Sequence, residues 1–359
     1  MKTWSDTRIL KLFNIDLPIL QAPMAGANNS VMAIAVAKAG GLGSIPCALY
    51  TADQIRNEVQ KFRAETNKPL NLNFFCHKNP APDSIREENW LKKLEAYYHE
   101  FGLDSKNGYT PSSRNPFDEK SCELVLELKP EVVSFHFGLP AKELVTKLKA
   151  AHIKIISSAT TVDEARFLTE NGCDAIIAQG FEAGGHRGIF QSLDINTQVG
   201  TMALVPQIAD AVSIPVIASG GIADARGIVA SFALGASAVQ IGTAYLFCPE
   251  SLISPVHRKA LKSVKDNQTT LTNIFTGRPA RAIENRLTKE LGPMNILAPE
   301  FPLAGGPLSP LKAKTEPMGS GDFMSMWSGQ AAHLAVELPA EELTKHLANE
   351  ALKRMRMFD

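Results

Sequence analysis

The sequence lacks the features that mark disulfide-bonded, zinc-ribbon or membrane proteins. Its 359 residues include five widely spread cysteines and no C-x-x-C pair, so neither a disulfide framework nor a zinc ribbon is indicated. An odd number of separate thiols is typical of a reducing compartment. No stretch reaches the roughly 18 apolar residues of a membrane span, and the N-terminus lacks a signal-peptide apolar segment. We expect a cytoplasmic protein without a membrane partner.

An excess of either charge is also lacking. The 37 basic and 37 acidic residues give a formal net charge of zero, so no electrostatic footprint for nucleic acid is present. G-x-S-x-G, H-E-x-x-H and Walker A motifs are absent, and we expect no metal. What the sequence does have is 45% hydrophobic and only 21% charged residues. That composition predicts a substantial folded core.

Short apolar runs alternate with helical patterns through most of the chain. Most of these runs are continuously apolar, which is typical of parallel strands buried on both faces. Eight β-α repeats favour a closed (β/α)8 TIM barrel, an α/β fold, over an open sheet of fewer strands. The predicted strands are residues 18–24, 41–46, 69–75, 131–137, 153–159, 174–180, 214–221 and 237–243.

Two segments interrupt this repeat. Residues 76–120 are polar and rich in Pro and Asn, and they look like an insertion after the third strand. Residues 249–335 are too long for an ordinary connection, and we predict that they form a smaller cap inserted after strand 8. Residues 1–248 would then be the barrel, and 336–359 a closing helix packed on it.

Glycines follow the last two predicted strands. The active site of such a barrel lies at the C-terminal ends of its strands, and the loops after strands 7 and 8 commonly hold a phosphate on backbone N–H groups. Gly220 and Gly221 follow the seventh strand, and Gly242 and Thr243 close the eighth. The alternative is two tight turns that merely need glycine. We favour a phosphate site.

Three amides lie on otherwise largely apolar strands, at or near the end that faces the site. An unpaired amide is costly there, and amides both donate and accept, which suits the edges of a heterocycle such as a flavin. Alternatively, these amides satisfy one another or the loop backbone. They are Asn73, Gln179 and Gln240.

His186 is the main candidate for proton chemistry. It lies in the glycine-rich stretch "AQGFEAGGHRGIF", residues 178–190, and an unperturbed histidine serves as acid or base near neutral pH. The alternative is a cap or a cofactor contact. His136, at the end of the fourth strand, competes for the role. Glu182 either orients His186 or forms a surface salt bridge with Arg187.

Seven motifs, in order along the chain, resemble class I nitronate monooxygenases, formerly called 2-nitropropane dioxygenases. They span residues 21 to about 281, and a cap follows them. The motifs are "QAPMAG" (21–26), "NLNFF" (71–75), "HFGLP" (136–140), "AQGFEAGGHRG" (178–188), "PVIASGGIADARG" (215–227), "LGASAVQIGTAYL" (234–246) and "FTGRPAR" (275–281).

The resemblance implies FMN-dependent, metal-free oxidation of alkyl nitronates, such as propionate 3-nitronate, by O2 to a carbonyl product and nitrite. His186 matches the histidine proposed in that family as the base that deprotonates a neutral nitroalkane, although a nitronate needs no base. The positions carried over for FMN are Met24, Ala25, Gly26, Asn73, Gln179 and Gly184, with the phosphate on Gly221, Gln240, Ile241, Gly242 and Thr243.

The cap departs from the family pattern. Phe301 stands where a tyrosine is usual, which removes a hydroxyl that would contact the nitro group. Lys312 is a candidate anion partner, and His136 a candidate substrate contact. The main alternative is an FMN-dependent enoyl-acyl-carrier-protein reductase using NAD(P)H. An inosine-monophosphate-dehydrogenase-like barrel would need a cysteine after strand 6, which is absent, and a flavin-free barrel is the third alternative. Oligomeric state is left open.

Overall fold

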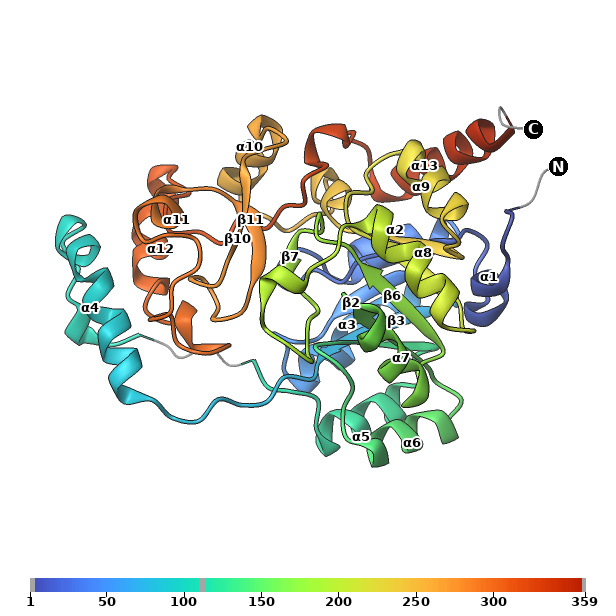
Figure 1. Ribbon diagram of the computed structural model, residues 1–359, viewed down its shortest axis with the longest axis horizontal. Helices are drawn as coiled ribbons and strands as arrows, with labels where there is room; N and C mark the ends of the chain where they lie inside the picture. The colour runs from blue at the N-terminus through green and yellow to red at the C-terminus, as the bar shows by residue number, and fades with distance from the viewer. Residues whose placement is uncertain (1–3, 110–113, 357–359) are drawn as a thin grey trace.

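The barrel consists of eight parallel strands whose carboxyl ends face one side. The computed structural model describes residues 4–109 and 114–356 (Figure 1). The sheet order is β1-β9-β8-β6-β5-β4-β3-β2, and a parallel bridge between Leu20 and Leu42 joins the first and last strands. The predicted TIM barrel is confirmed. The strands are β1 (Ile19–Gln21), β2 (Gly43–Pro46), β3 (Leu70–Phe75), β4 (Val132–His136), β5 (Lys154–Ala159), β6 (Ala175–Gln179), β8 (Val216–Ser219) and β9 (Ala238–Ile241).

Helices between the barrel strands cover the outer face of the sheet. The closing helix α13 packs between α9 and α2, and Tyr245 Oη lies 2.7 Å from Thr344 Oγ1 within it. Inside the barrel, Val132, Ile156 and Ile217 belong to a fully buried layer that also includes Ile9 and Phe13 of α1 (Arg8–Phe13). The covering helices are α2 (Ser30–Lys38), α3 (Ala52–Glu65), α5 (Glu119–Leu128), α6 (Lys142–Ala150), α7 (Val162–Glu170), α8 (Thr201–Ala211), α9 (Ala225–Ala233) and α13 (Ala340–Met355).

The insertion after β3 and the segment after β9 share one hydrophobic core. Trp90 of α4 (Ser84–Glu100) is fully buried in it, and its Nε1–H donates to Ala304 O at 3.0 Å. Figure 1 shows α4 against the cap, on the side away from the barrel. We therefore propose that the insertion and the cap form one unit. The other cap elements are α10 (Pro255–Ser263), α11 (Arg286–Glu290), α12 (Ser309–Thr315), β10 (Thr269–Thr272) and β11 (Ala280–Ile283).

Besides helix α4 in the insertion, two features were not anticipated from the sequence. The first is α5, whose buried face is only Cys122, Leu124 and Val125. The second is a small antiparallel sheet of order β10-β11-β7, in which β7 (Gly185–His186) is the glycine-rich loop itself. His186 pairs with Ala280, so the loop after β6 is hydrogen-bonded to the cap.

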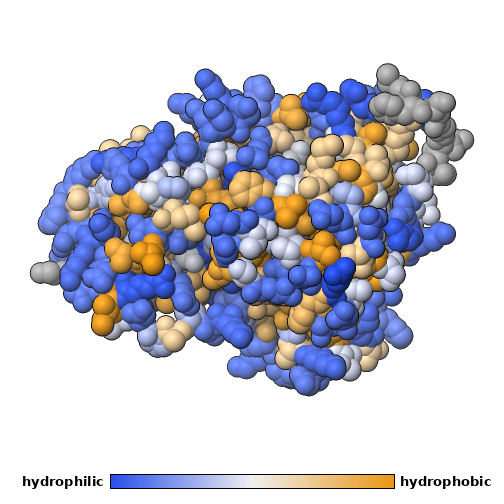
Figure 2. Space-filling view, viewed as in Figure 1, coloured by the Kyte–Doolittle hydropathy of each residue, from blue (hydrophilic) through white to orange (hydrophobic). Residues whose placement is uncertain are grey.

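The visible surface is mostly hydrophilic. Figure 2 shows hydrophobic side chains in separate groups over both barrel and cap, rather than in one band. In the described part of the chain, no helix combines the length and the apolar character needed to cross a membrane.

Candidate active site

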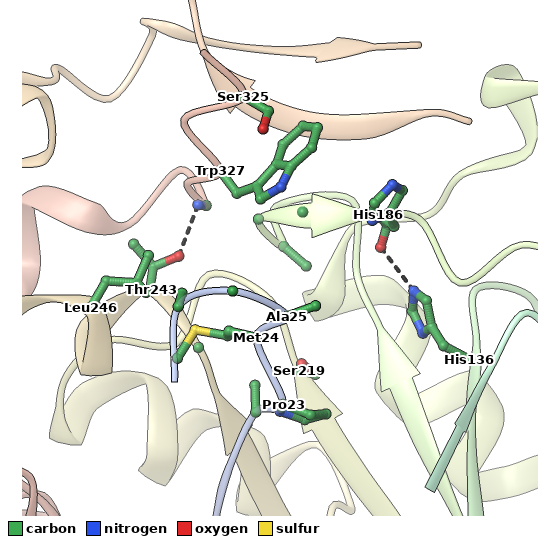
Figure 3. Close-up of a pocket in the computed structure, with 18 of the residues that line it drawn as sticks. Pro23, Met24, Ala25, His136, His186, Ser219, Thr243, Leu246, Ser325 and Trp327 are labelled. Carbon is green, nitrogen blue, oxygen red and sulfur yellow. Dashed lines mark hydrogen bonds between the residues drawn. The ribbon is translucent and has the colours of Figure 1, made fainter. Parts of the chain in front are cut away.

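A cavity of about 520 Å³ lies where the barrel strands end, between the barrel and the cap. Figure 3 shows Pro23, Met24 and Ala25 along one side and Trp327 across from them. His186 and His136 form another side, and Thr243 lies opposite those two histidines. Ligand pockets commonly have volumes of roughly 300–1,000 Å³, so the cavity is large enough for a cofactor and part of a substrate.

Two loops present free backbone donors to this cavity. Gly220 and Gly221 have φ of +110° and +70°, a left-handed conformation that glycine adopts without strain. Within the described chain, the N–H groups of Gly221, Ile222 and Ala223 donate to no protein acceptor, and α9 begins just after them. Such free donors next to a helix N-terminus suit an anion.

The second donor loop follows β9. Gly242 and Thr243 begin a short 3-10 helix, η3 (Thr243–Phe247), and line the cavity. Thr243 Oγ1 accepts from the N–H of Gly329 at 2.9 Å, which ties this loop to the segment that carries Trp327. The two loops after β8 and β9 therefore share one end of the cavity.

The three amides have different partners. Gln240 Oε1 is buried and has no partner among the described residues, so it is free to accept from a ligand. Asn73 Nδ2 donates to Ser134 Oγ at 3.0 Å. Gln179 holds its own loop, because its Nε2 donates to His186 O at 3.0 Å and its Oε1 accepts from Gly188 N at 2.7 Å. The loop-backbone alternative therefore describes Gln179 in this structure.

Gly184 is needed where the loop crosses the cap. A Cβ atom on Gly184 would lie 2.5 Å from Gly329 N and 2.6 Å from Ser328 C. Both are backbone atoms that cannot turn aside, so the crossing admits only glycine. Close contact here brings the next residues, Gly185 and His186, into line with β11.

The His186 ring is enclosed by aromatic side chains. Its centroid lies 5.3 Å from that of Trp327 and 5.4 Å from that of Phe301. Its Nε2 is 2.9 Å from Thr276 Oγ1. The ring therefore faces an apolar wall with one hydroxyl contact, and the same cavity lies beside it.

Burial and surrounding cations keep His186 neutral. Burial is the largest cause that lowers the pKa of His186 well below its usual 6.5, and the positive charges of Arg114 and Arg278 lower it further. Burial also lowers the pKa of His136 to about 4. A carbonyl only accepts, so His136 Nε2 donates to His186 O at 3.1 Å (Figure 3).

Glu182 and Arg187 are not paired in this structure. Glu182 accepts from the N–H and the hydroxyl of Thr201 at the start of α8. Arg187 is fully buried and donates to Gln179 O at 3.0 Å and Gln198 Oε1 at 2.9 Å. The predicted surface salt bridge is therefore wrong, because the chain turns Arg187 into the protein behind the loop.

Most of the predicted site residues line the one cavity. Ile241 is an exception, since its side chain is packed in the core between sheet and helices. The ring of Phe301 lies behind that of His186, and Lys312 reaches the cavity beside Glu316. The predicted residues on the cavity wall are Met24, Ala25, Gly26, Asn73, His136, Gln179, Gly184, His186, Gly221, Gln240, Gly242, Thr243 and Lys312.

Sequence analysis missed three residues at the site. Trp327 and Thr276 contact the His186 ring from the cap, and Arg114 lines the cavity from the insertion. Arg114 lies in a polar stretch without periodicity, so no pattern marks it. Thr276 does fall within the "FTGRPAR" motif, which was a usable signal.

Comparison with known proteins assigns the family. The nitronate monooxygenase family model matches residues 6–350. The chain belongs to the nitronate monooxygenase family. A relative named nitronate monooxygenase, from Pseudomonas aeruginosa, is 41% identical over 96% of this chain and 98% of its own.

Solved structures agree with this family. The nitroalkane oxidase of Streptomyces ansochromogenes superposes with a TM-score of 0.89 at 36% identity, covering 98% of this chain and 100% of that one. FabK from Thermotoga maritima superposes with a TM-score of 0.73 at 28% identity, covering 98% and 99%. The likeness of this nitronate monooxygenase family member to FabK is thus weaker in both sequence and structure.

Proposed function

We propose that this protein oxidises alkyl nitronates with O2, giving a carbonyl product and nitrite, and that FMN is its cofactor. Membership of the nitronate monooxygenase family, a family of flavoenzymes, carries the proposal. The free thiols of all five cysteines fit the cytoplasmic location that we also propose.

The residues present fit FMN. The free N–H groups of Gly221, Ile222 and Ala223, with the loop at Gly242 and Thr243, suit its phosphate. The unpartnered Oε1 of Gln240 suits a donor on the ribityl chain or the ring.

When bound, FMN would supply the redox chemistry, and the chain's own residues position the reactants. Trp327 lines the cavity next to His186, and the rings of Trp327 and Phe301 both pack against the imidazole. The cations around the histidine favour an anion in the space next to it. The residues of the chain therefore bind the substrate and stabilise its negative charge.

The state of His186 favours a nitronate over a neutral nitroalkane. Proton abstraction would create an imidazolium cation in a buried site already surrounded by Arg114 and Arg278, which opposes it. A nitronate arrives already deprotonated and carries the charge that this site attracts. We therefore propose that His186 contacts the nitronate as a neutral side chain.

The alternative is an FMN-dependent enoyl-acyl-carrier-protein reductase that uses NAD(P)H. The more distant likeness to FabK is the observation behind it. In such an enzyme NAD(P)H would be the reductant and an enoyl thioester the oxidant. The proposed function instead uses a nitronate as reductant and O2 as oxidant, so the two functions differ in both substrates.

The test is to purify the protein, record its visible spectrum and extract the flavin for identification. O2 uptake is then followed with propionate 3-nitronate, and NADPH oxidation with a crotonyl thioester. The proposal predicts a yellow, FMN-containing protein that consumes O2 with the nitronate. A colourless protein, or thioester-dependent NADPH oxidation without nitronate turnover, would refute it.

A further inference from the structure

One cation that lines the cavity has no anionic or hydrogen-bonding partner for its side chain among the described residues. Among the described residues, the charged side chains that line the cavity are Arg114, Lys312 and Glu316. Lys312 Nζ lies 3.9 Å from Glu316 Oε2, so these two charges offset each other. The guanidinium of Arg114 forms no ion pair or hydrogen bond within residues 4–109 and 114–356. The cavity lining therefore carries one uncompensated positive charge.

The barrel holds the Arg114 backbone in place. His77 Nε2 donates to Arg114 O at 3.1 Å. Three residues further on, the N–H of Phe117 donates to Phe75 O at 2.7 Å, and the Phe117 ring packs edge-on against Phe74 with centroids 5.0 Å apart. The insertion thus returns from the cap to the ends of β3 and β4 with Arg114 at a defined position.

Arg114 and His186 both contact the ring of Phe301. The Cζ of Arg114 lies 5.6 Å from the Phe301 ring centroid, and that centroid lies 5.4 Å from the His186 ring. Arg278, the other nearby arginine, already donates to Ile189 O and lies over the Phe137 ring at 4.1 Å. Arg114 is therefore the cation available to a ligand, and it shares the Phe301 contact with His186.

We propose that Arg114 binds a second anionic group of the substrate, a carboxylate, at the end remote from the nitronate that lies beside His186. The assignment of the reacting group rests on the proposed function. A partly buried cation without a partner is unfavourable, and the guanidinium fork matches a carboxylate with two parallel hydrogen bonds. Because Arg114 and His186 contact the same ring, a substrate whose carboxylate is a few carbon atoms from the nitronate can reach both.

The carboxylate subsite makes Arg114 a specificity-determining residue. It discriminates between a carboxylated nitronate and an alkyl nitronate of the same length, because only the former reaches the guanidinium with a charge. Thr243 lies across the cavity from His186 (Figure 3), and among the described residues no hydrogen bond or ion pair joins Arg114 to the loops at Gly221 and Thr243, so the substitution of Arg114 leaves them intact.

The test compares propionate 3-nitronate with the nitronate of 1-nitropropane, in which a methyl group replaces the carboxylate. In R114Q holoenzyme, kcat/KM for propionate 3-nitronate should fall on the order of 10- to 100-fold. The value for the alkyl nitronate should fall far less, by about two- to fivefold, because Arg114 acts on that substrate only through the general positive field around His186, and R114K should recover part of the larger loss. The control is K92Q, which removes an exposed charge from α4 of the same insertion and should leave both values unchanged.

A binding measurement separates this proposal from the proposed function. Succinate mimics a carboxylated nitronate and butyrate lacks the second charge, so calorimetry on the holoprotein should show tighter binding of succinate, lost in R114Q. If succinate binds through Arg114 but no nitronate is turned over, the subsite stands and the proposed function fails. If R114Q, with unchanged flavin content and circular dichroism, affects both nitronates equally or neither, the carboxylate subsite is refuted.

Discussion

His186 is positioned by its backbone as much as by its ring. Its carbonyl accepts from Gln179 Nε2 at 3.0 Å and from His136 Nε2 at 3.1 Å, and its own strand pairs with β11. Two buried donors on one carbonyl fix where the imidazole leaves the chain. Both donors belong to barrel strands. The barrel therefore holds the backbone of His186 in place, while the imidazole ring faces the cap.

The pH dependence follows from the neutral state of His186. A pKa well below 6.5 means that the side chain stays unprotonated as pH rises from 6 to 9, so no step of its titration falls in that range. We expect kcat/KM for a preformed nitronate to show no inflection near pH 6.5. A wild-type inflection near 6.5 that disappears in H186N would contradict this expectation.

Replacing Gln179 tests the loop clamp. Q179A removes both hydrogen bonds to the loop, each worth about 1 kcal/mol net, so kcat with a nitronate should fall on the order of 10-fold while most of the flavin is retained. The control is Q207A on the exposed face of α8, whose amide bonds only Ala203 O. Complete flavin loss in Q179A with a normal kcat after reconstitution would instead make Gln179 a cofactor contact.

At the scale of elements, the loop after β8 depends on a backbone conformation that favours glycine. Gly221 has φ of +70°, and a Cβ there would lie 3.3 Å from Glu182 Cβ. A left-handed conformation costs a non-glycine residue roughly 1–2 kcal/mol, and the loop must keep it to present its N–H groups.

G221A should therefore weaken flavin binding on the order of 10-fold, measured as Kd by fluorescence titration of the apoprotein. G319A is the matched control, because Gly319 also has a positive φ, +81°, but a Cβ there meets nothing within 4 Å. Equal flavin affinity in G221A and wild type would show that this loop does not hold the phosphate.

Helix α4 gives the cap much of its core. Trp90 and Leu94 are fully buried and Tyr98 nearly so, and the Tyr98 hydroxyl donates to Pro307 O at 2.6 Å. This hydrogen bond links residues 209 positions apart in the chain. The cap is therefore incomplete without the insertion.

W90A should destabilise the cap by about 3–5 kcal/mol. Limited proteolysis should then cut within 249–335 much faster than in wild type. I85A on the same helix, at a side chain 73% exposed, should leave the digestion pattern unchanged. If the cap of W90A resisted proteolysis as well as that of the wild type, the packing of α4 would not be needed to stabilise the cap.

At the scale of the whole molecule, the barrel could be predicted from the sequence, but the contacts that join the barrel, the insertion and the cap could not. Continuous apolar runs such as "DAIIAQG" (174–180) mark buried parallel strands, and the glycine loops mark their functional ends. The position of Arg114 depends on where a polar insertion returns after crossing the cap. The pairing of His186 with Ala280 joins segments far apart in the chain, which no local pattern encodes.

The site shows the same division. Gly221, Gly242 and Thr243 could be placed from fold-level rules because strand ends meet at one side of a barrel. The partners of Gln179 could not be predicted, because an amide at the end of a strand can form the same hydrogen bonds with a ligand or with the backbone of its own loop. Only the fold decides between them, and here Gly188 and His186 occupy both ends of the amide.

The most direct test of nitronate oxidation is anaerobic mixing of the flavin-loaded enzyme with each candidate reductant in turn. We predict rapid bleaching of the flavin absorbance by propionate 3-nitronate and none by NADPH on the same timescale, with the colour returning once O2 is admitted. Rapid bleaching by NADPH in the absence of nitronate, with no response to the nitronate, would contradict the account.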